Sequence, residues 1–204
     1  ESLGLDIKTH NEKGQNLLHL LSRSNKDTLL LNYLVARGVS LNQKDDEGIS
    51  ALSVAVQRKN FTALALCEFH KADFSVVDNN GLTLLHKAVA HEEWALMDLI
   101  LKHKVDINAK NNEGMTALHL ASMSGESINF IKSMLSAGAD KQIRTEFGEN
   151  AYDLAIENEL MNKNLKDLKI YFRNMKKLFV YLSLIMLVTI LTSSDMPVGE
   201  VQYK

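Results

Sequence analysis

Five glycines recur along the chain at nearly constant intervals, and this period constrains the fold more than any other feature. The intervals are 34, 33, 33 and 34 residues, and each glycine opens a similar phrase in which polar residues give way to apolar ones. A unit of two short helices cannot bury its apolar face alone, so such units stack on their neighbours and share a continuous core. The period therefore predicts a solenoid of stacked repeats rather than a globule built around a pocket.

The five phrases align position by position. The fourth reads Gly114-Met-Thr116-Ala-Leu-His119-Leu-Ala, and Asn-Asn-Glu precedes it. Glycine tolerates a positive φ and the Asn side chains can bond their local backbone, so a tight turn is expected there, with Thr116 as the N-cap of a first helix. The positions that recur are Gly14, His19, Gly48, Gly81, Thr83, His86, Gly114, Thr116, His119 and Gly148.

These phrases resemble the T-P-L-H-x-A signature of the ankyrin repeat family. The later half of the units agrees, because Ser136-Ala-Gly138-Ala-Asp140 resembles the Gly-Ala-Asp-x-Asn ending of that family. The resemblance covers roughly residues 8 to 160. It implies an all-α solenoid of helix-turn-helix units with projecting turns. We expect units near 11–44, 45–77, 78–110 and 111–144, followed by a cap at 145–160, so that one repeat domain spans residues 1–160.

Two departures from the family pattern are informative. The proline of the motif is absent from every unit, which removes some pre-organisation of each first turn. The histidine is replaced by Ser53 in the second unit and by Asp153 in the fifth. A terminal unit with added polar groups suits a position where its outer face meets water, so the fifth unit is predicted to cap the solenoid.

Composition and motifs argue against several classes of function. The formal net charge of the 204 residues is −2 and the pI is near 6.4, whereas nucleic-acid binding needs a concentrated basic surface. The sequence has no Gly-rich phosphate loop, no Cys/His metal motif and no nucleophile with a base at a recognisable spacing. The chain is therefore predicted to be no enzyme, to hold no metal or cofactor and to bind no nucleic acid.

The histidines and the single cysteine are better explained as structural residues. Equivalent residues of stacked units lie roughly 10 Å apart, which is too far for His19, His86 and His119 to share one zinc ion. In the ankyrin family this histidine bonds between neighbouring repeats, and the resemblance implies the same role here. Cys67 is expected to lie buried on the apolar stripe of a second helix.

Recognition is expected at the positions that differ most between units. The resemblance implies that the turns project as fingers, that the first helices line a concave palm, and that protein partners bind to these two surfaces. Phe147 stands out as an aromatic residue at a turn tip, with folding back onto the cap as an equal alternative. The predicted partner-binding residues are Lys44, Asp46, Asn79, Leu82, His91, Asn112, Met115, Met123 and Phe147.

The residues that follow the repeats have a different composition. Residues 161–174 form a basic amphipathic stretch, predicted to be a linker, and the run from Leu178 to Leu191 holds no charge. That run is shorter than the roughly 20 residues that span a bilayer. With Met175-Lys-Lys before it and Thr192-Ser-Ser194 after it, it is typical of a secretion signal. Three interpretations of residues 175–204 stay open: a fused second reading frame that begins with a signal, a membrane anchor with a cytoplasmic basic flank, and a last apolar helix packed on the solenoid.

These observations favour a scaffold or adaptor that binds a protein partner through its turn tips and concave helix face. Two rivals stay open: a membrane-tethered adaptor that uses Leu178 to Leu191, and a regulatory fragment of a larger enzyme. The chain is expected to be a monomer with its repeats in the cytoplasm, either free or held at a membrane, with the periplasm as an open alternative. It starts at Glu1 without an initiator methionine, so we expect a fragment or a processed product, and the signal-like segment indicates a bacterial source.

Overall fold

The computed structural model describes residues 6–24, 28–124 and 128–157. These residues belong to Glu1–Asn162, the first of two compact units into which the chain divides. The predicted linker at 161–174, and the fused-frame, anchor and last-helix interpretations of 175–204, lie outside the described residues. Among the described residues, no helix combines the length and the apolar character that a membrane crossing requires.

The described residues fold into short α-helices, and their only strand-like pairings are isolated antiparallel bridges at the bases of loops. This confirms the all-α architecture predicted from the sequence. The helices are α1 (Leu17–Leu21), α2 (Thr28–Ala36), α3 (Ala51–Gln57), α4 (Phe61–Phe69), α5 (Leu84–Ala90), α6 (Trp94–Leu101), α7 (Ala117–Ser124), α8 (Ile128–Ser136) and α9 (Ala151–Glu157).

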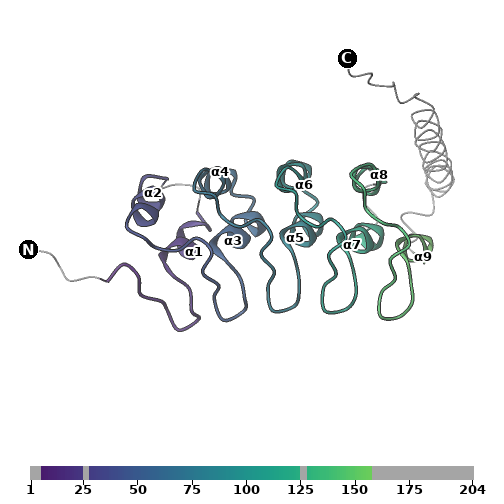
Figure 1. Ribbon diagram of the computed structural model, residues 1–204, viewed down its shortest axis with the longest axis horizontal. Coiled ribbons are helices and arrows are strands. Elements are labelled where there is room, and N and C mark those ends of the chain that lie inside the picture. The colour runs from purple at the N-terminus through teal and green to yellow at the C-terminus, as the bar shows by residue number, and fades with distance from the viewer. Residues whose placement is uncertain (1–5, 25–27, 125–127, 158–204) are drawn as a thin grey trace, which may run out of the picture. The chain divides into compact units, whose positions relative to one another are not determined.

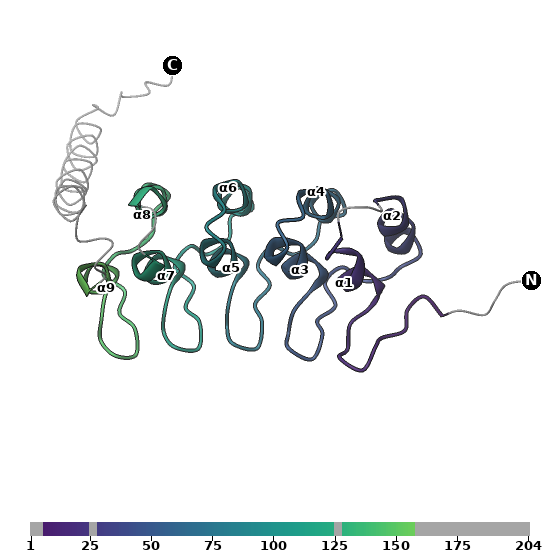
Figure 2. The ribbon, with the colours of Figure 1, turned by 180° about the vertical axis from the view of Figure 1, so that it is seen from behind.

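Two rows of helices run through the described residues (Figure 1). The first row consists of α1, α3, α5, α7 and α9, and each of these helices contacts the next along the row. The second row consists of α2, α4, α6 and α8, each packed against the first-row helix that precedes it in the chain (Figure 2). Five loops project from the first row on the side away from the second row. We call them finger loops; they are residues 11–15, 45–49, 78–82, 111–115 and 145–149.

The core lies between the two rows and between successive repeats. Each of the first four first-row helices buries a leucine at the same position, with at most 1% of its surface exposed: Leu18, Leu52, Leu85 and Leu118. Small residues at the helix starts, such as Ala51, Ala117 and Ala151, are buried to the same degree. Their small volume lets neighbouring helices approach closely in the stack.

Glycine is required where successive finger loops approach each other. Gly81 has a φ of +74°, and a Cβ atom there would lie 2.9 Å from the backbone nitrogen of Asn112. Any other residue would combine left-handed strain with this clash. The N–H of Asn112 donates to the carbonyl of Asn80 (3.0 Å), and equivalent backbone bonds join the other neighbouring finger loops. The finger loops are thus bonded edge to edge.

Each second-row helix is followed within three residues by a residue with a positive φ. Gly138 follows α8 with a φ of +99° and forms a left-handed cap. Gly38 has the same role after α2, with a φ of +84°. Lys71 and Lys104 occupy the equivalent position with φ of +56° and +55°, although a side chain there costs about 1 to 2 kcal/mol.

Candidate interaction site

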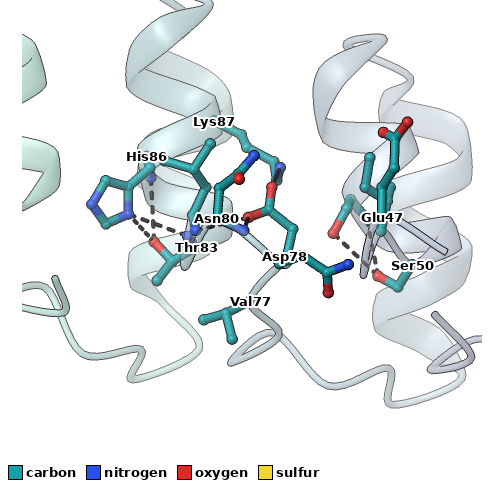
Figure 3. Close-up of polar contacts among 12 residues, drawn as sticks. Glu47, Ser50, Val77, Asp78, Asn80, Thr83, His86 and Lys87 are labelled. Carbon is teal, nitrogen blue, oxygen red and sulfur yellow. Dashed lines mark hydrogen bonds and ion pairs between the residues drawn. The ribbon is translucent and has the colours of Figure 1, made fainter. Parts of the chain in front are cut away.

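The repeated histidines connect three of the first-row helices, α1, α5 and α7, to residues farther along the chain. Thr83 caps α5, and its backbone N–H donates to Nδ1 of His86 (3.2 Å) (Figure 3). Nε2 therefore carries the ring proton and donates to the carbonyl of Met115 in the following repeat (3.0 Å). His19 makes the equivalent bond to the carbonyl of Ile49 in the second repeat, whereas Nε2 of His119 bonds the carbonyl of Ile143 at the end of its own repeat. The bond between repeats that the resemblance implied is thus present for His19 and His86. In residues 6–24, 28–124 and 128–157, no three metal-ligating side chains gather at one point.

Stability should decrease in mild acid because of these histidines. Burial lowers the pKa of His19, His86 and His119 below the ordinary value, since a charged imidazole would lose its hydration inside the stack. The folded protein therefore binds fewer protons than the unfolded chain. As the pH falls below about 6.5, the free energy of unfolding should drop by up to about 1.4 kcal/mol per pH unit for each histidine. Urea denaturation from about pH 7.5 to 5.5 measures this, and a free energy of unfolding that stays constant over that range would contradict it.

Cys67 lies in α4 with no exposed surface, as predicted. Burial raises the pKa of its thiol to about 12, and the thiolate is the form that alkylating reagents attack. We expect iodoacetamide at neutral pH to leave Cys67 unmodified in the folded protein and to label it completely in urea, as followed by intact mass. Equal labelling rates in the two conditions would show that the native thiol is accessible.

Several of the predicted recognition residues join the finger loops to one another. Nδ2 of Asn79 donates to the carbonyl of Asp46 (2.8 Å), and Nδ2 of Asn112 donates to the carbonyl of Asn79 (2.9 Å). Nζ of Lys44 donates to the carbonyl of Val77 (2.8 Å). These side chains hold neighbouring loops at a fixed spacing. Variation between repeats did not reveal this role, because it depends on contacts that exist only in the stack.

The remaining predicted residues differ in how much of their side chain is exposed to solvent. Phe147 is 84% exposed at the tip of the fifth finger loop, so it does not fold back onto the cap. Met123 is exposed near the end of α7, whereas His91 is half-buried as the C-cap of α5. Leu82 and Met115 are half-buried in their finger loops. Phe147 therefore offers the largest exposed fraction among these apolar side chains.

A hollow of about 370 Å³ lies between the second and third finger loops. Three of the predicted residues, Asp46, Asn79 and Leu82, line it, and the other six do not. The exposed Glu47 adds a second carboxylate at the loop tip. Lys87 is the only cation among the described residues that line the hollow, so its rim is acidic. The lining residues are Asp46, Glu47, Ile49, Gln57, Asp78, Asn79, Asn80, Leu82 and Lys87.

Lys87 is the residue of this hollow that sequence analysis missed. Its side chain is 6% exposed, and Nζ donates to Oδ2 of Asp78, whose side chain is 5% exposed (Figure 3). Oδ1 of Asp78 accepts the N–H groups of Asn80 (3.0 Å) and Leu82 (2.9 Å). The ion pair therefore fastens the third finger loop to α5 of its own repeat. The signal available in the sequence was a lysine at a repeat position that is apolar in every other unit. The residues at that position in the other units are Leu20, Val54, Leu120 and Leu154.

Comparison with known families agrees with this geometry. Residues 62–145 match the family model for ankyrin repeats, in three copies. This stretch, which includes the third finger loop and Lys87, is similar to the ankyrin repeat family, which supports the resemblance found in the sequence. Ankyrin repeats generally mediate protein–protein interaction, so a protein partner is the expected ligand class. No curated protein matches the chain.

Proposed function

We propose that the described repeats bind a protein partner through the finger loops and the first-row helices, and that the hollow between the second and third finger loops receives a basic side chain of that partner. The convergence of Asp46, Asn79 and Leu82 on this hollow carries the proposal. The carboxylates of Asp46 and Glu47 lie on an exposed rim. Such groups attract a Lys or Arg side chain and reject an acidic one, which gives specificity as well as affinity.

Pre-organisation supports this function. Backbone bonds join neighbouring finger loops, and the side chains of Asn79 and Asn112 add further links. The ion pair of Lys87 with Asp78 fixes the third loop to α5. A partner that binds to loops held in this way loses little conformational entropy in ordering them, so more of the contact energy appears as affinity. The proposed role is that of a rigid scaffold without chemistry of its own.

The proposed surface extends beyond the hollow. Phe147 presents an aromatic ring at the last finger loop, and exposed aromatic and Met side chains are frequent sources of binding energy at interfaces. The further residues that we assign to the partner-binding surface are Lys44, His91, Asn112, Met115, Met123 and Phe147.

A peptide library displayed on phage tests the acidic hollow with a probe of defined chemistry. The wild-type protein should select peptides rich in Lys and Arg, and Glu47→Lys should weaken their binding about tenfold or more, a change of about 1.4 kcal/mol. Asp98→Lys is the matched control, because it alters the charge equally on α6, where Asp98 pairs with Lys102 on the exposed surface (3.2 Å). Selected peptides that bind wild type and Glu47→Lys with equal affinity would exclude the hollow as the recognition site.

A further inference from the structure

The first repeat exposes apolar side chains at positions that are less exposed in later repeats. Leu17, Leu20 and Leu30 are 38%, 42% and 41% exposed. The register of the finger-loop glycines aligns Leu17 with Leu84, and the register of the positive-φ residues aligns Leu30 with Leu96. Both of these equivalents have no exposed surface. We call Leu17, Leu20 and Leu30 the N-terminal stacking face.

Burial of the equivalent positions follows from stacking on the preceding repeat. α5 contacts α3 before it and α7 after it, whereas α1 contacts α3 after it and no described helix precedes α1. The difference between Leu17 and Leu84 is thus the presence of a neighbour on the N-terminal side. Three leucines left partly in water at one end of a stack form an apolar patch of the kind that marks an interaction site.

The residues that lead into the first finger loop have the geometry of a connection between repeats. The N–H of Lys8 donates to Oδ1 of Asp6 (2.9 Å). The same turn recurs where a second-row helix leads into the next finger loop. The recurring bonds are Ser75 to Asp73 (2.8 Å), Asn108 to Asp106 (2.9 Å) and Gln142 to Asp140 (2.8 Å). In those three repeats, the aspartate follows a helix pair stacked on the face that corresponds to the N-terminal stacking face.

We propose that the N-terminal stacking face is the docking surface for a further helix pair of the ankyrin type that leads into the turn at Asp6. The third repeat indicates which helix pair fits. Its α5 contacts α3 of the preceding repeat, and its Leu84 and Leu96, which are leucines like Leu17 and Leu30 at the same positions, are fully buried. A short covalent connection at Asp6 holds such a pair at high effective concentration, which favours it over a second copy of the chain. This inference is independent of the acidic hollow.

Grafting the chain's own helix pair onto Asp6 tests the inference. Residues 45–72 carry α3 and α4 and precede Asp73, which aligns with Asp6, so the graft joins residue 72 to residue 6 in natural register. Because a solenoid gains stability with each stacked interface, the grafted protein should melt at least about 5 °C above the original chain. The dye ANS, which binds exposed apolar surface, should bind it less.

The leucines of the face provide the matched control. Leu17→Gln with Leu30→Gln should change the melting temperature of the ungrafted chain little and should abolish the gain from the graft, because only the graft buries these positions. A graft that leaves the melting temperature unchanged or lower overturns the inference. An ungrafted chain that dimerises in sedimentation analysis, with the dimer lost in the double variant, also overturns it and assigns the face to a second copy.

Discussion

Lys87→Leu should lower the free energy of unfolding by about 3 to 5 kcal/mol, because it leaves the buried carboxylate of Asp78 without its counter-charge. The carboxylate would still accept two backbone N–H bonds from the third finger loop. Its desolvation would no longer be offset by the ammonium group. Urea denaturation followed by circular dichroism measures the loss.

The fourth repeat supplies the control for this variant. Oδ1 of Asn111 accepts the same pair of backbone bonds, from Glu113 (3.0 Å) and Met115 (2.9 Å), and Leu120 stands at the position of Lys87. The double change of Asp78→Asn with Lys87→Leu copies this arrangement and should be at least as stable as the wild type, as is often found when apolar residues replace a buried ion pair. A double variant as unstable as Lys87→Leu would show that the single variant fails through packing rather than through charge.

Leu118→Ala should cost about 2 to 5 kcal/mol of unfolding free energy, because it opens a cavity between the rows of helices. Leu118 lies in α7 and is 1% exposed. Leu29→Ala is the matched control, since the same change is made in α2 where the side chain is 81% exposed, and it should alter stability by about 0.5 kcal/mol or less. Thermal melting of the two variants compares them, and similar losses would contradict the packing described for the first row.

The glycine period predicted most of the fold because one stacked unit determines the next. Register predicted the paired helices, the turn glycines and the buried Cys67, and the resemblance to the ankyrin repeat family implied the bridging histidines. The extent of the bonding between finger loops was not predicted. Asn79 and Asn112 looked like variable recognition residues, and their role depends on a neighbouring loop 33 residues away. A contact across that separation exists only once the repeats are stacked.

The candidate site was predicted in part. Asp46, Asn79 and Leu82 were selected from their loop positions and do line one hollow. Lys87 was missed because a single lysine at a repeat position that is otherwise apolar looks like a tolerated exception to the pattern. Its burial could have been inferred only by searching the sequence for a group that would compensate the charge of a buried lysine. Asp78, nine residues earlier, provides the answer through the turn that brings it beneath α5.

The hydrogen bonds of the histidines give the stack a direction. For His19 and His86 the imidazole of the earlier repeat donates and the carbonyl of the later repeat accepts. A cut between two repeats therefore creates two chemically different ends. The earlier piece retains a buried N–H without an acceptor, at a cost of about 1 to 3 kcal/mol, whereas the later piece retains apolar side chains without a cover. A shortened version of this protein would need a polar acceptor at one end and an apolar cover at the other.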